Sequence, residues 1–251
     1  MRRIVSAAFA LLLLTAAARA EPPPPPGLAA LARDGGFVER FLAAALDGPP
    51  YYNPLLATVN PGRLARIADG RRLNYFAWRG FPDDEPASIA RIRALTGLGP
   101  APEVSEPGYD DAAFMAVETR DMLAARPVRG PGIAAPFFTA SAPETVPGAV
   151  CGVFVQSGNV LRPRELSDMT VHVLATAPPA AQQRCLARAA LRALGLAGIG
   201  EYADGVLPAA ADPVTLLTPE EEGFLWLLYR LPVGADRETL RAGAVDILDR
   251  L

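Results

Sequence analysis

The chain has 251 residues, of which 51% are hydrophobic and 20% are charged. This balance is typical of a chain that buries a core, and it excludes a globally disordered protein. Its 24 basic and 27 acidic residues give a formal net charge of −3. Such a balance disfavours a nucleic-acid partner, because phosphate neutralisation needs a basic surface.

Residues 1–20 have the pattern of an export signal. Arg2 and Arg3 precede an apolar run that closes on a small-x-small cleavage site at Ala20. A membrane anchor is the alternative, but the apolar run is shorter than the roughly 20 residues that a spanning helix needs. Residue 21 is glutamate rather than a cysteine that could be acylated. We therefore predict cleavage near Ala20, a periplasmic or secreted protein, and no stable membrane anchor after cleavage.

The remaining chain is predicted to contain a proline-rich spacer at 21–27 and a single domain at 28–251. Hydrophobic spacing and turn residues predict the elements of that domain. In chain order these are a helix at 36–46, a short helical piece at 63–68, a strand at 71–78, a helix at 86–96, strands at 111–119, 149–156 and 169–175, a helix at 178–194, and two more helices after Thr218 and Asp236. Thr218 and Glu221 match a capping box, and Asp236 is expected to cap the last helix.

The helix at 178–194 is the part of the chain most informative about function. In a zinc peptidase of the zincin class, the corresponding helix reads His-Glu-x-x-His, in which two imidazoles bind the metal and the glutamate acts as general base. In this sequence the three positions are Arg188, Ala189 and Arg192. Arginine stays protonated and cannot ligate zinc, so the pattern predicts no metal, no other cofactor and no catalytic residue of that type.

The neighbouring motifs resemble a known family. Cys185 lies three residues before Arg188, residues 193–196 read Ala-Leu-Gly-Leu, and residues 217–219 read Leu-Thr-Pro ahead of Leu-Leu-Tyr at 227–229. Over roughly 72–242 these features resemble an exported proteobacterial zincin-like domain family of unknown function, some of whose members are described as lipoproteins. The resemblance implies an α+β, zincin-like fold: a small mixed β-sheet packed on an active-site-type helix, with a helical C-terminal part.

The family's zinc motif is often degraded to Glu-Glu-x-x-Gln, and this chain departs from the motif further. Gly198 occupies the position of a third ligand, in addition to the replacements on the helix. The resemblance therefore implies a pseudo-peptidase that does not cleave peptides.

The two cysteines, Cys151 and Cys185, are predicted to form a disulfide, because an exported chain meets an oxidising compartment. The bridge would close a loop of about 35 residues and stabilise the fold by roughly 4 kcal/mol. Metal binding by the two thiols is the weaker alternative. His172 is the only histidine of the chain, so a zinc site would also need carboxylates.

Arg184, Arg188 and Arg192 are the candidate ligand-binding residues, because a spacing of four places them on one helix face. One interpretation is a solvated face with partners such as Glu201 or Asp204. The other is a cationic cleft that binds an anionic ligand or an acidic peptide. Both interpretations stay open from the sequence.

The leading functional hypothesis is a periplasmic domain, catalytically inactive, that binds a peptide, a glycan, an anionic ligand or a partner protein. The alternative is a hydrolase that uses carboxylates of the former cleft. The candidates for that alternative are Asp110, Asp111, Glu118 and Asp121. His172 has no accompanying nucleophile motif, and we assign it no catalytic role.

Overall fold

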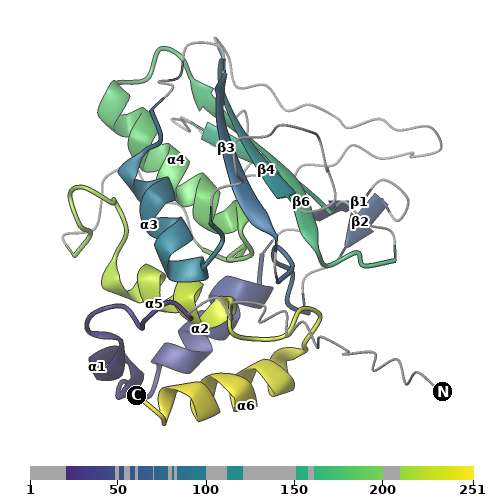
Figure 1. Cartoon of the computed structure of the whole chain (residues 1–251), viewed down its shortest axis with the longest axis vertical. Coiled ribbons are helices and arrows are strands. Elements are labelled where there is room, and N and C mark those ends of the chain that lie inside the picture. Colours follow the sequence, from purple (N-terminus) through teal and green to yellow (C-terminus); the bar gives the residue numbers. More distant parts are fainter. Residues whose placement is uncertain are drawn as a thin grey trace, which may run out of the picture.

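The computed structural model describes residues 21–48, 51–53, 57–59, 62–69, 71–78, 81, 84–99, 112–120, 151–157, 161–199 and 210–251. Its fold is α+β, with helices gathered beside and below one sheet (Figure 1). The elements are α1 (Leu28–Ala32), α2 (Phe37–Leu46), β1 (Tyr51–Asn53), β2 (Ala57–Val59), β3 (Arg72–Trp78), α3 (Ala87–Thr96), β4 (Ala112–Arg120), β5 (Cys151–Ser157), β6 (Leu166–Leu174), α4 (Pro179–Ala193), α5 (Pro219–Leu228) and α6 (Arg237–Leu248).

The sheet is mixed and six-stranded, in the order β2-β1-β5-β6-β4-β3. Neighbours β1 and β5, β6 and β4, and β4 and β3 are parallel, whereas β1 and β2, and β5 and β6, are antiparallel. Alternate residues of the two central strands are buried: Val153 and Val155 of β5, and Met169, Val171 and Val173 of β6. Because side chains alternate across a strand, these five residues form one apolar face.

Helix α4 covers part of the sheet. It contacts β5 and β6, and α3 lies beside it (Figure 1). Leu186, Ala187, Ala190 and Leu191 of α4 are buried, and the two alanines let the helix approach the strands closely. The predicted helix at 178–194 is confirmed, and Gly195 ends it with a φ of 117°, a conformation that glycine adopts without strain.

The remaining helices form a second cluster below the sheet, centred on α5 (Figure 1). The ring of Phe224 lies 5.1 Å from that of Phe37 and 5.9 Å from that of Phe41, which joins α5 to α2. The two predicted caps are confirmed by hydrogen bonds: the Thr218 hydroxyl accepts from the Glu221 backbone at 3.2 Å, and the Asp236 carboxylate accepts from the Thr239 backbone at 3.0 Å.

One predicted element is wrong. Residues 63–68 form no helix; they are extended and lie between two segments that are distant in the sequence. Leu64 exchanges backbone hydrogen bonds of 2.8 Å with residues 234–235, and Arg66 exchanges bonds of 3.0–3.1 Å with residues 164–166. These partners satisfy the backbone groups that a helical turn would otherwise pair, so tertiary context overrides the local pattern.

The proline-rich segment at 21–27 is packed against the domain instead of standing apart as a spacer. Proline cannot donate a backbone hydrogen bond, but its carbonyl still accepts. The Pro22 carbonyl accepts from the indole Nε1 of Trp226 at 3.0 Å and from the guanidinium of Arg230. The Glu21 carboxylate pairs with Nε of Arg230 at 2.8 Å, and Pro25 is buried.

The predicted export signal and its cleavage site at Ala20 lie outside the described residues. Within the described ranges, no helix is long and apolar enough to cross a membrane.

Candidate functional site

The arginines of α4 are largely engaged by their own chain. Arg188 forms an ion pair with Glu221 on α5, and the two side chains are 13% and 9% exposed. Arg192 donates to the backbone carbonyl of Ile199 from Nε at 3.0 Å and from Nη2 at 2.8 Å. Arg184 is half-buried on the same helix. The structure therefore gives Arg188 and Arg192 internal partners rather than a solvated face.

Two of the positions that the sequence predicts to correspond to the zinc site of a zincin, Ala189 and Gly198, are packed. Ala189 is buried within α4. A Cβ added to Gly198 would lie 2.2 Å from the carbonyl oxygen of Ala43, so this position has no room for a ligating side chain. Among the described residues, no group of three or more histidine, cysteine or carboxylate side chains is placed to hold a metal ion.

Cys185 is disulfide-bonded on the buried face of α4. The other cysteine of the chain, Cys151, begins β5, the strand that α4 contacts, but its side chain lies outside those that the structure describes. The Cys151–Cys185 pairing stays a prediction, and it agrees with the packing of these two elements.

The side chains of the candidate catalytic carboxylates, and of the acidic partners suggested for the α4 arginines, are not among those that the structure describes. Asp110, Asp111 and Asp121 lie outside the described residues, as do Glu201 and Asp204, and the side chain of Glu118 on β4 is likewise not described. His172 is half-buried on β6, where its neighbours on either side, Val171 and Val173, point into the buried apolar face. Its register partner on β5 is Gly152.

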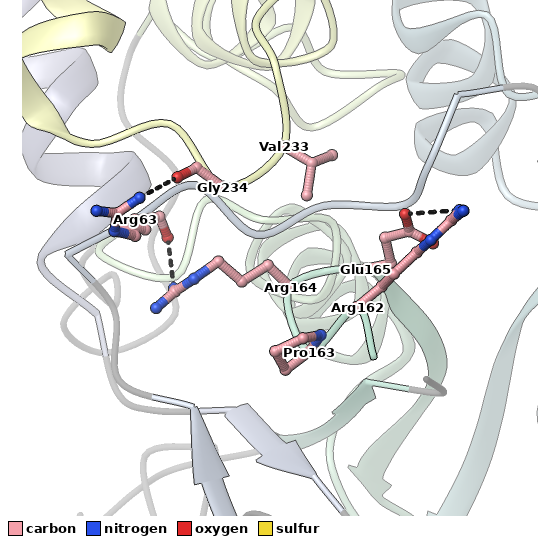
Figure 2. A pocket seen from close by; sticks show the side chains of 7 residues that line it. All are labelled: Arg63, Arg162, Pro163, Arg164, Glu165, Val233 and Gly234. Atoms are coloured by element: carbon pink, nitrogen blue, oxygen red, sulfur yellow. Dashed lines mark hydrogen bonds and ion pairs between the residues drawn. The ribbon is translucent and has the colours of Figure 1, made fainter. Parts of the chain in front are cut away.

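A pocket of about 460 Å³ lies elsewhere in the molecule (Figure 2). Three segments line it: the extended segment that begins at Arg63, the connection that leads into β6, and the loop between α5 and α6. The lining residues are Arg63, Arg162, Pro163, Arg164, Glu165, Val233 and Gly234. We call this the arginine pocket.

Backbone pairing holds the three segments together. The extended segment at 63–66 is bonded to 234–235 on one side and to 164–166 on the other. Gly234 has a φ of 82°, a left-handed conformation that other residues adopt only with strain. In this conformation its N–H donates to Leu64 and its carbonyl accepts from Nη1 of Arg63 at 3.2 Å. The turn at Gly234 therefore fixes one wall of the pocket.

The charges in the arginine pocket are crowded. Arg164 donates from Nη1 to the backbone carbonyl of Arg63 at 3.1 Å, so two cationic side chains lie at one end of the pocket. Burial and the charge of Arg63 lower the pKa of Arg164. At the other end, Arg162 pairs with Glu165 at 3.3 Å (Figure 2). An anion at the first end would relieve the repulsion between the two guanidinium groups.

Tyr51 adds a polar group near Arg164. Its side chain is 4% exposed, and its hydroxyl has no hydrogen-bond partner among the described residues. Burial raises the pKa of Tyr51, so the hydroxyl stays protonated at neutral pH, and it lies close enough to influence the pKa of Arg164. A buried hydroxyl without a partner is costly and often marks a functional region.

Arg66 lies on the same extended segment but has a structural role. It is 2% exposed, and its guanidinium donates to the carbonyl of Leu231 and to the carboxylate of Asp69 at 2.8–3.2 Å. It also lies 5.2 Å from the ring of Tyr229. These contacts tie the extended segment to the end of α5.

Sequence reasoning did not identify the arginine pocket. Its cationic residues come from segments about 100 positions apart, so no spacing rule connects them. The one local signal is the Arg-Pro-Arg-Glu run at 162–165, which reads as a turn with surface charges.

Comparisons with protein-family models, with curated proteins and with solved structures find no match for this chain.

Proposed function

We propose that this protein is an exported, non-catalytic binding protein that holds an anionic ligand in the arginine pocket. The observation that carries the proposal is that the described residues lining a 460 Å³ pocket include three arginines and one glutamate. Guanidinium groups present several N–H donors in a planar fork that suits carboxylate and phosphate oxygens. The volume lies within the range of small-molecule sites.

The zincin-like assignment is part of this proposal. It is supported by the motifs around α4, by the mixed sheet that α4 contacts, and by the two helices that follow. We propose that α4 keeps the position of an active-site helix while its former catalytic positions serve the core. The ion pair of Arg188 with Glu221 and the packing at Gly198 support this interpretation.

Binding in the periplasm follows from the predicted export signal, and the ligand is proposed to be an anion rather than a nucleic acid or a metal. The α4 arginines contribute to the fold in this proposal. The arginine pocket takes over the ligand-binding role predicted for Arg184, Arg188 and Arg192.

The test is calorimetric titration of the purified protein with sulfate, inorganic phosphate and acetate at low salt. We expect one of these anions to bind with a one-to-one stoichiometry. The double variant Arg63→Gln and Arg164→Gln should weaken that binding about tenfold or more, because charged hydrogen bonds are lost.

Arg250→Gln is the matched control, because Arg250 is an exposed arginine just after the end of α6 that pairs with Asp246. It should bind anions as the unmodified protein does. Absence of binding to all three anions, or equal binding by the double variant, would overturn the proposed function.

A further inference from the structure

We infer that the surface formed by Gly97, Trp226 and Arg230 is a binding site for an acidic proline-rich segment of another protein, of the form Glu-Pro-x-x-Pro. Residues 21–25 of this chain have that sequence and occupy the surface as a built-in competitor. We call this surface the tryptophan site. It shares no residue with the lining of the arginine pocket, so this function goes beyond the anion binding proposed above.

The N-terminal segment meets the domain at every third residue. Pro22 is half-buried and Pro25 is buried, whereas the prolines between and after them are exposed. Three residues make one turn of a polyproline II helix, so this spacing turns one edge of such a helix toward the domain. A Cβ built on Gly97 would lie 3.4 Å from Cγ of Pro22, which places the Pro22 ring against the end of α3. The segment therefore has the contact pattern of a Pro-x-x-Pro ligand.

Two donors of the domain converge on one backbone carbonyl of the segment. Nε1 of Trp226 donates to the Pro22 carbonyl at 3.0 Å, and Nη2 of Arg230 donates to the same oxygen. Nε of Arg230 pairs with the Glu21 carboxylate at 2.8 Å. The Arg230 side chain is only 7% exposed, and burial lowers its pKa to about 10. Because a buried cation and a buried indole N–H need acceptors, the site selects a peptide carbonyl with an acidic residue directly before it.

The tryptophan site is built by the domain itself. Trp226 lies on α5 and Arg230 lies just after its end, at a spacing of four that places both side chains on one face. The Arg230 guanidinium lies 3.5 Å from the centre of the Trp226 ring, and its Nη1 donates to the Trp226 carbonyl at 2.6 Å. These contacts do not involve the N-terminal segment. They hold both donors in place when the segment leaves, so the site is preorganised for a ligand.

The segment is held at the two side chains by few contacts. Those described are the two hydrogen bonds to the Pro22 carbonyl and the ion pair of Glu21, whose side chain is 72% exposed. An exposed ion pair contributes little, because water screens it. The covalent tether favours the segment, since it gives an effective concentration on the order of millimolar. A partner that presents the same motif together with contacts of its own can therefore replace the segment.

The experiment measures binding of a fluorescent peptide with the sequence of residues 21–27 to the purified protein by fluorescence anisotropy. The opening variant, Glu21→Ser with Pro22→Ser, removes the carboxylate and the first docked ring of the tethered segment. It should bind the peptide at least about tenfold more tightly than the unmodified protein, because the tethered competitor is weakened. The matched control, Pro23→Ser with Pro24→Ser, changes two exposed prolines and should gain no more than about threefold.

Two further substitutions, each made in the opening variant, locate the bound peptide. Arg230→Gln should weaken binding about tenfold, because it removes the cation that pairs with the glutamate of the peptide. Trp226→Phe should weaken binding about fivefold, because it removes the indole donor but keeps an aromatic ring. A peptide with arginine in place of its glutamate should bind the opening variant about tenfold more weakly, and this comparison needs no further change in the protein.

The opening variant should keep the melting temperature within a few degrees of the unmodified protein, because Glu21 is exposed and Pro22 is only half-buried. Failure of the folded opening variant to bind the peptide would overturn the inference, and so would equal binding by the opening variant and the unmodified protein. Equal binding of the arginine peptide would remove the acidic specificity and overturn it as well. If the unmodified protein sediments as a dimer and the opening variant as a monomer, the occupant is a second copy and the inference fails. The titrations with sulfate, phosphate and acetate test the arginine pocket separately.

Discussion

Two sets of arginines in this protein have opposite environments. Arg188 and Arg192 of α4 lie on one helix face and are bonded to Glu221 and to the carbonyl of Ile199. The arginines of the pocket come from separate segments, and among the described lining residues cations outnumber carboxylates. Regular spacing on a helix thus accompanies a structural role, and an irregular arrangement accompanies the candidate binding role.

The difference lies in what each guanidinium meets after folding. A helix delivers its arginines to neighbouring helices, where a single carboxylate or a carbonyl satisfies them. In the pocket, the backbone pairing of the extended segment holds Arg63 and Arg164 close together, although their positive charges repel each other. The charge of Arg63 adds to burial in lowering the pKa of Arg164.

The largest expected effect is on the stability of the α4 pair. Arg188→Gln should lower the free energy of unfolding by about 3 kcal/mol, because it removes the cation that pairs with the buried carboxylate of Glu221. Urea denaturation measures this loss. The double variant Arg188→Gln and Glu221→Gln should recover part of it, and a loss below about 1 kcal/mol for the single variant would place Arg188 with the pocket arginines instead.

A smaller loss of stability is expected at Arg192. Arg192 donates to the neutral carbonyl of Ile199, so Arg192→Gln removes hydrogen bonds to an uncharged group. The expected decrease in unfolding free energy is about 1.5 kcal/mol, again measured in urea. A decrease equal to that of Arg188→Gln would show that carbonyl and carboxylate partners are equivalent in this helix.

The pocket should show the reverse behaviour. Arg63→Gln is expected to change the free energy of unfolding by no more than about 0.5 kcal/mol, while it weakens anion binding as described above. Thermal unfolding without ligand measures the first quantity, and calorimetry measures the second. A large loss of stability together with unchanged binding would make Arg63 a structural residue and remove the contrast between the two sets.

The smallest effect, close to zero, is expected from metal removal. Because Arg188, Ala189, Arg192 and Gly198 occupy the positions that we propose for the former zinc site, EDTA should leave the melting temperature unchanged, and elemental analysis should find no stoichiometric zinc. One zinc per chain would contradict the pseudo-peptidase proposal. The purified protein should also leave casein uncleaved.

The sequence predicted the long periodic elements well. Helices α2, α4 and α6 have apolar residues at helical spacing, and caps such as Thr218 and Asp236 mark where helices begin. The strands β5 and β6 alternate buried and less buried residues, and they were also predicted. Such elements carry their own local signal.

The missed parts depend on partners far along the chain. The strands β1 and β2 have three residues each, too few for a recognisable alternation. Residues 63–68 are extended only because 164–166 and 234–235 pair with them. The arginine pocket is also built from segments that are distant in the sequence, so no local pattern could have predicted it.

The docking of Pro22 onto Trp226 and Arg230 has a consequence for the order of events during export. If the signal is cleaved after Ala20, Glu21 becomes the amino-terminal residue. The carbonyl of the next residue, Pro22, accepts hydrogen bonds from Trp226 and Arg230. A peptidase must bind the residues on both sides of the bond that it cuts, so the docked segment would be sterically protected. If the predicted cleavage occurs, it is therefore expected to precede docking of the N-terminal segment.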